Sequence, residues 1–206
     1  MAKITLGPML RLAHATPRTW KLSVLVLADE SPGPLTTHGG VAPVLADPVA
    51  IPTVRGHSAW RYVFEVALGD APQTMRYTAP GAFEGHFTLP AAGRLPRMAY
   101  ASCNGLSDPQ LAHDVSTLDA LWHVLVGRHE QTLGPDPDPA VPYHLLLLGG
   151  DQIYADPLFQ NPPFREWQSL FNIGKYQASF TACMRDVAER YYHDRYVEVF
   201  GMPMTA

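Results

Sequence analysis

The fold of this chain is decided by one stretch, His144-Leu145-Leu146-Leu147-Leu148-Gly149-Gly150-Asp151-Gln152-Ile153-Tyr154-Ala155-Asp156. Its run of leucines is apolar on both faces, which is typical of a strand inside a covered parallel sheet. Two glycines and an aspartate follow at once, so the strand ends in a sharp turn. We therefore predict a parallel strand over 144–148 with polar side chains at its carboxyl end.

A second short strand is predicted one helix earlier, over 97–102. The helix between the two strands is predicted over 107–130, because Ser107 can cap its first turn and apolar residues follow at helical spacing. Strand, helix and strand form a βαβ unit, whose crossover is almost always right-handed. A further helix is predicted over 180–196, and we expect it to pack on this sheet.

The first part of the chain is a series of short strands separated by proline-rich turns. In the clearest of them, 60–66, alternate side chains are apolar, which is typical of a half-buried strand. Other short strands are predicted at 20–28, 41–54, 75–78 and 83–89. We predict the fold class α/β: an antiparallel β-sandwich-like domain of about six strands over 1–94, followed by the first part of an α/β domain over 95–206.

Composition places the chain among ordinary globular proteins. It has 206 residues, of which 47% are hydrophobic and 17% charged, and a formal net charge of -4. No basic stripe is present, which argues against nucleic acid as a partner. No apolar run is long enough to span a membrane, and no signal peptide or twin arginine is visible, so we expect a cytoplasmic location. Composition does not predict the oligomeric state.

Two polar clusters fall at the ends of the two predicted parallel strands. They are Ala101-Ser102-Cys103-Asn104 and the stretch 149–156. In open α/β sheets, ligands bind beyond the carboxyl ends of the strands. The topology therefore predicts that Cys103 and Asp151 approach one another.

These residue types fit a metal site. A thiolate, a phenolate and a carboxylate, from Cys103, Tyr154 and Asp151, together suit iron. Ordinary structural roles remain open for each of them. Gly-Gly-Asp after a strand is often only a turn, Tyr154 fits a core position with a satisfied hydroxyl, and a free cysteine commonly acts as a small buried hydrophobe.

The defining motifs of several other classes of protein are absent from this sequence. There is no Gly-x-x-x-x-Gly-Lys-Ser/Thr loop, which excludes a P-loop nucleotide site. There is no Gly-x-Ser-x-Gly elbow, which argues against an α/β-hydrolase. The two cysteines, Cys103 and Cys183, form no Cys-x-x-Cys pair, so structural zinc is not indicated.

The strings at the strand ends resemble those of a known family. The stretch 144–156 resembles the first carboxylate motif of the alkaline phosphatase D (PhoD-like) family, which belongs to the calcineurin-like metallophosphoesterases. Tyr100-Ala101-Ser102-Cys103-Asn104 resembles the motif one strand earlier. The start of the chain, including Gly7-Pro8-Met9-Leu10-Arg11, is similar to the accessory domain that precedes the catalytic domain in many members. The resemblance covers nearly the whole chain.

The resemblance implies an activity and a set of ligands. The activity is metal-dependent hydrolysis of small phosphate mono- or diesters, whose phosphorus is attacked in line by activated water. Asp151 is implied as the catalytic carboxylate that bridges two metals, with Tyr154 and Cys103 as ligands of iron. The second metal is implied to be divalent, usually calcium. Asn104 and Asp156 lie beside these positions and receive no role.

The sequence departs from the family after the last predicted helix. The family continues with an Asp-Asp-His block and later histidines, which complete the metal site and hold phosphate. Neither is present here, and we interpret His193-Asp194, within a helical pattern, as a solvated face. We therefore expect the chain to be the amino-terminal part of an enzyme. The alternative is a shortened, non-catalytic relative that acts as a binding or interaction module.

The coding sequence past Ala206 separates these two hypotheses. We expect an in-frame Asp-Asp-His block there, because three ligands leave a two-metal site incomplete. Sequencing the gene checks this directly. A stop codon immediately after Ala206 would support the non-catalytic relative.

Overall fold

A computed structural model describes residues 2–39, 44–45, 47–53, 56–103, 120–130 and 142–201. These residues form a mixed α/β structure whose sheets are mostly antiparallel, which confirms the predicted class at that level. The predicted boundary near residue 94 falls in an irregular segment between two strands, and the division into two domains stays a prediction.

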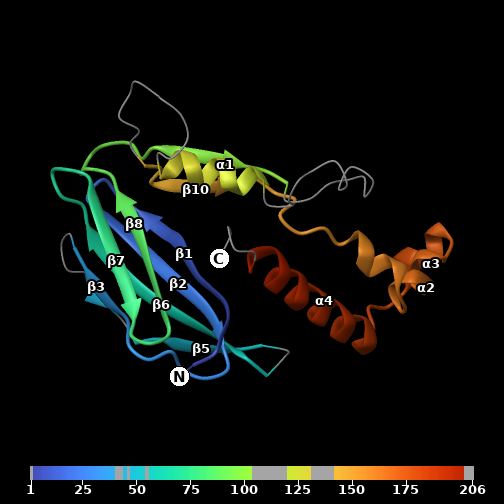
Figure 1. Ribbon diagram of the computed structural model, residues 1–206. Coiled ribbons are helices and arrows are strands. Elements are labelled where there is room, and N and C mark those ends of the chain that lie inside the picture. The colour runs from blue at the N-terminus through green and yellow to red at the C-terminus, as the bar shows by residue number, and fades with distance from the viewer. Residues whose placement is uncertain are drawn as a thin grey trace.

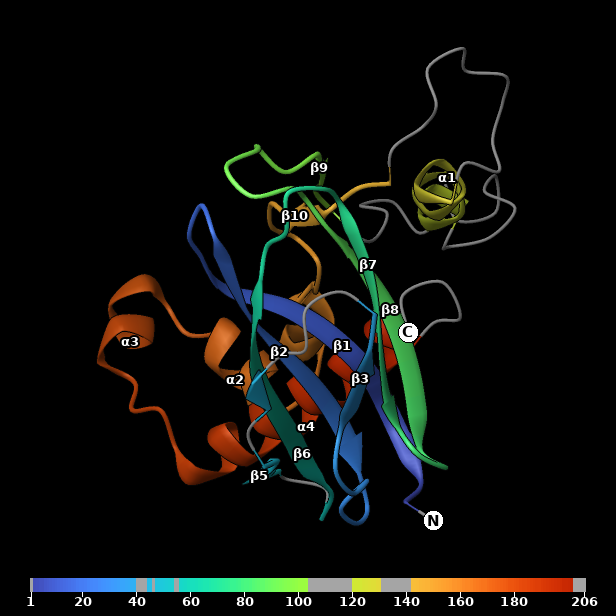
Figure 2. The same cartoon turned by 90° about the vertical axis from the view of Figure 1, so that its left-hand side faces the viewer.

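Two antiparallel sheets build the first part of the chain. Their strands are β1 (Ile4–Ala15), β2 (Thr19–Ala28), β3 (Thr36–His38), β4 (Val44–Leu45), β5 (Val49–Pro52), β6 (Ser58–Ala67), β7 (Gln73–Ala79) and β8 (Phe83–Leu89). One sheet has the order β1-β2-β6-β4, with β5 also paired to β6, and the other has the order β3-β7-β8. Figure 2 shows the strands of the two sheets lying across from each other.

The core of this sandwich lies between the two sheets. β2 and β6 pair so that Leu22 is opposite Phe64 and Val24 is opposite Tyr62, and each of these side chains is 3% exposed or less. The second sheet contributes Met75, Tyr77, Phe87 and Leu89 to the same cluster. The alternation predicted over 60–66 is thus confirmed, and it fixes which face of β6 is buried because side chains alternate along a strand.

β1 and β3 are strands that the sequence analysis did not predict. Gly7-Pro8 interrupts the pattern of β1, and the register of β1 against β2 shifts at three places. Proline cannot donate to a ladder, but β1 lies at the edge of its sheet, where that loss is tolerated. Gly7 has a φ of 98°, and a Cβ at this position would lie 2.6 Å from the carbonyl oxygen of Leu25 on β2.

The predicted βαβ unit is present around a two-stranded parallel sheet. It consists of β9 (Met98–Ala101), α1 (Ala120–His129) and β10 (Leu145–Leu148), with Leu145 opposite Met98 and Leu148 opposite Ala101. The first half of the predicted helix, 107–119, lies outside the described residues. The expected cover over β10 is incomplete within the described part of the chain, since Leu147 and Leu148 are each 44% exposed.

Short helices follow β10 and lead to one long helix. They are the 3-10 helix η2 (Asp156–Gln160), α2 (Phe164–Gln168), α3 (Asn172–Gln177) and α4 (Ala182–Phe200). The expectation that the last helix packs on the parallel sheet is wrong. α4 contacts β1, and its Met184 packs against Leu158 and Phe164. Figure 1 shows α4 lying away from β10. None of the described helices combines the length and the apolar character needed to cross a membrane.

His144 fixes the start of the parallel pair. Its backbone N–H donates to the Arg97 carbonyl at 2.9 Å, and its ring Nδ1 accepts from the Arg97 N–H at 2.9 Å. The preceding residue, Tyr143, accepts a hydrogen bond from Thr88 of β8 at 3.1 Å, which ties the pair to the sandwich. Burial lowers the pKa of His144, and the charges of Arg97 and His129 act in the same direction.

The hydrogen bond from the Arg97 N–H to the His144 ring predicts that the folded protein is destabilised by acid. As pH falls below about 6.5, the unfolded chain protonates His144 while the folded chain resists, so the free energy of unfolding decreases. Protonation also removes the lone pair with which Nδ1 accepts the Arg97 N–H. His144→Asn keeps an acceptor without titrating and is expected to lose this part of the pH dependence. Urea unfolding between about pH 8 and about pH 5 measures it.

His14→Asn, at an exposed position of β1, is the matched control and should retain the wild-type pH slope. Equal slopes for wild type and His144→Asn would contradict the role given to the His144 ring.

Candidate metal centre

Backbone hydrogen bonds extend the β9–β10 ladder past the carboxyl ends of both strands. The Gly149 N–H donates to the Ala101 carbonyl at 2.8 Å, and the Cys103 N–H donates to the Gly150 carbonyl at 2.9 Å. Because the strands are parallel, both chains leave the sheet at the same edge. Cys103 and Asp151 are therefore brought together by the strands themselves.

The three predicted ligands meet at this edge. The Cys103 Sγ lies 3.9 Å from Oδ2 of Asp151, the long end of a thiol–carboxylate hydrogen bond. The Tyr154 phenol lies near the Cys103 side chain, which raises the pKa of the phenol. Cys103 and Asp151 are exposed and Tyr154 is half-buried, so the group faces solvent. The structure thus places the three side chains together, and their role as ligands stays a prediction.

Negative and acceptor groups accumulate around Tyr154. The neighbouring Cys103 side chain raises the pKa of the phenol most, and partial burial and the charges of Cys103, Asp151 and Asp156 raise it further. The phenol, which is neutral at physiological pH at its ordinary pKa, is therefore still harder to deprotonate. A bound cation reverses this balance, because its positive charge favours the deprotonated form of every group around it.

The turn that carries Asp151 has an unusual backbone. Cys103 and Asp151 have φ angles of 63° and 53°, in the left-handed region that residues other than glycine rarely adopt. Gly150 has a φ of 116°, and a Cβ at Gly149 would overlap the ring of Tyr100. The two glycines therefore form the sharp turn that the sequence predicts. Strained backbone of this kind is concentrated at functional sites.

Further polar groups surround the centre. The Ser102 Oγ lies 3.6 Å from the Cys103 Sγ, and the Gln152 side chain donates to the Gly150 carbonyl at 2.8 Å. Tyr191 of α4 donates its hydroxyl to the Tyr154 carbonyl at 2.7 Å. The sequence analysis missed all of these contacts. No local sequence pattern links Tyr191 to Tyr154.

The donor set is small but chemically consistent. In the described part of the chain, no three side chains among His, Cys, Asp and Glu are grouped so as to hold a metal ion. The centre has two such residues, Cys103 and Asp151, and Tyr154 as its third donor. Thiolate, carboxylate and phenolate fit iron. Calcium takes six to eight oxygen ligands, so a second ion of this kind needs donors beyond Asp151. Asn104 lies outside the described residues.

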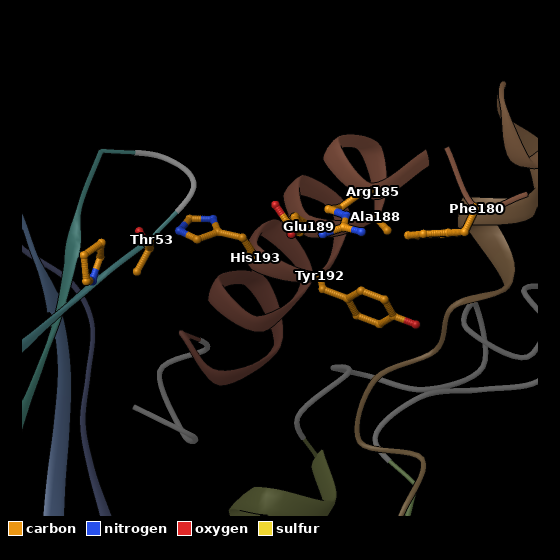
Figure 3. Close-up of a pocket in the computed structure, with 8 residues that line it drawn as sticks. Thr53, Phe180, Arg185, Ala188, Glu189, Tyr192 and His193 are labelled. Carbon is orange, nitrogen blue, oxygen red and sulfur yellow. The ribbon is translucent and has the colours of Figure 1, made fainter. Parts of the chain in front are cut away.

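A separate groove lies between the end of β5 and α4. It encloses about 470 Å³ and is lined by Arg185, Tyr192 and His193 from α4 and by Thr53 from the other side (Figure 3). The interpretation of His193-Asp194 as a solvated face is confirmed for Asp194, whose side chain is 53% exposed, and wrong for His193. The His193 side chain is 13% exposed, and its ring stacks on His57 with 6.3 Å between centroids. None of the three candidate ligands lines this groove.

Comparisons with known proteins leave the family open. No protein family and no solved structure matches the chain. An uncharacterized protein of Saccharomyces cerevisiae is 27% identical over 147 residues, which cover 69% of this chain and 19% of the yeast protein. The chain therefore spans about a fifth of the length of that relative.

The left-handed backbone at Cys103 predicts that valine at this position lowers the free energy of unfolding more than glycine does. Cys103→Val is expected to lower the free energy of unfolding by about 1–2 kcal/mol, because a branched Cβ is strained at positive φ. Cys103→Gly should leave the free energy unchanged or raise it slightly. Urea unfolding of both variants measures the difference.

Cys183 supplies the matched control. It lies in the first turn of α4 and is exposed, and in a helix glycine costs more than valine. The order of the Val and Gly variants is therefore expected to reverse there. The same order at both positions would contradict the strain at Cys103.

Proposed function

We propose that this chain carries part of the active site of a metal-dependent phosphoesterase of the PhoD-like kind, with a metallophosphoesterase-type α/β arrangement around it. The observation that supports the proposal best is the meeting of Cys103, Asp151 and Tyr154 at the carboxyl edge of β9 and β10. The resemblance points to these three residues from sequence motifs alone. The βαβ topology brings Cys103 and Asp151 together independently of the resemblance.

In this proposal, Cys103 and Tyr154 hold iron, and Asp151 is shared with a second, divalent ion, for which we propose calcium. When bound, such ions activate water and neutralise charge on the phosphoryl oxygens. The residues of the chain orient and admit the substrate. Gly150 lacks a side chain and nothing lies within 4 Å of where its Cβ would be, so a phosphate group can approach the backbone of the turn closely. The exposed centre suits a small phosphate mono- or diester.

Iron binding provides the first test. The ferric-loaded protein is expected to be coloured, because a phenolate or thiolate bound to ferric iron absorbs visible light by charge transfer. Tyr154→Phe should remove or shift the band, whereas Tyr176→Phe, which alters a tyrosine that is 90% exposed in α3, should not. Iron capture should weaken as pH falls, since the ligands must lose their protons. Absorbance titration measures all three effects.

Asp151→Asn tests the reaction itself, in the longer protein that carries the expected Asp-Asp-His block. Asparagine tolerates positive φ, so the fold should survive while hydrolysis of p-nitrophenyl phosphate and bis(p-nitrophenyl) phosphate is abolished. Near-normal turnover in this variant would reduce Asp151 to a turn residue, and full activity in a colourless, iron-free protein would remove the iron assignment. Iron binding without hydrolysis of either ester would favour the non-catalytic alternative.

A further inference from the structure

The segment that carries Tyr154 is irregular and needs an external anchor. Residues 151–155, between β10 and η2, belong to no helix or strand, so no ladder sets their conformation. The Tyr154 phenol nevertheless lies near enough to Cys103 for that side chain to raise the pKa of the phenol. The hydroxyl of Tyr191 donates to the Tyr154 carbonyl at 2.7 Å and joins two segments that are 37 residues apart.

Helix α4, which carries Tyr191, is held in place by packing contacts. The Tyr191 ring packs with Val187 against the apolar cluster of Leu158, Phe164 and Met184. Further along the helix, Val199 is 2% exposed, and α4 contacts β1 of the sandwich.

The His193 side chain adds a second contact with the sandwich. It points away from α4 toward Thr53 and stacks on His57 (Figure 3). The Tyr191 hydroxyl therefore belongs to a helix that packs both on the cluster of Leu158, Phe164 and Met184 and on β1 of the sandwich.

We propose that Tyr191 is a positioning residue for the candidate metal centre: it holds the backbone at Tyr154 so that the phenol stays beside Cys103. The assignment of Tyr154 as a metal ligand rests on the proposed function. The coupling between Tyr191, Tyr154 and Cys103 does not, because it is a property of the protein without metal.

The reactivity of Cys103 reports this coupling without metal or substrate. In a Cys183→Ser background, Cys103 is the single thiol, and its rate of alkylation by iodoacetamide depends on its contact with Tyr154. Tyr191→Phe is expected to change that rate about fivefold, the effect of losing one neutral hydrogen bond of ordinary strength. Tyr192→Phe, the same change one residue further along α4, should leave the rate unaltered.

The decisive comparison is a double-mutant cycle. If Tyr191 acts through Tyr154, then Tyr191→Phe has no further effect in a Tyr154→Phe background. Val187→Ala, which weakens the same apolar cluster without removing the hydrogen bond, controls for general destabilisation. A full effect of Tyr191→Phe in the Tyr154→Phe background would overturn the proposal. So would equal effects of Tyr191→Phe and of either control.

The same variants loaded with ferric iron separate this inference from the proposed function. Tyr191→Phe is expected to shift or weaken the visible band while the unfolding transition is retained, whereas Tyr192→Phe should preserve the band. A wild-type protein that binds no iron would defeat the proposed function, yet the alkylation cycle would still decide the positioning role. Normal colour together with an unchanged alkylation rate in Tyr191→Phe would defeat the positioning role alone.

Discussion

The short ladder between β9 and β10 sets the positions at which Cys103 and Asp151 leave the sheet. It begins with the paired hydrogen bonds between His144 and Arg97 and continues past the strands to Cys103, whose N–H donates to Gly150. A slip of one residue in this register would turn each side chain to the opposite face of the sheet. Cys103 and Asp151 would then no longer face each other, even if the rest of the fold were unchanged.

This ladder is small, and the sandwich supports it along two routes. One route is direct, from Thr88 of β8 to the Tyr143 carbonyl at the start of β10. The other runs through α4, which packs on β1 and reaches the Tyr154 carbonyl through Tyr191. The buried core between the two sheets therefore stabilises a centre that itself faces solvent. This arrangement explains how an exposed group of side chains on a two-stranded sheet can hold a defined geometry.

The local chemistry of the centre is consistent with its geometry. Two residues other than glycine adopt left-handed backbone at the same edge, which carries an energetic cost in the protein alone. The neighbours of Tyr154 raise the pKa of its phenol, so its deprotonation is disfavoured in the protein without metal. A cation bound to Asp151 and Cys103 would lower that pKa, since it favours the charged forms of the groups around it.

The amino-acid sequence by itself determined the elements with strong local periodicity. Alternation in β6 predicted its buried face, the four leucines predicted β10, and parallel topology predicted that Cys103 meets Asp151. These inferences succeed because a period of two and a strand-end turn are properties of neighbouring residues. Only the tertiary structure decided that β1 is an edge strand, that α4 packs on the sandwich, that His193 is largely buried, and that Tyr191 reaches Tyr154. Each of these depends on contacts between segments distant in the chain, and such contacts leave no trace in local periodicity.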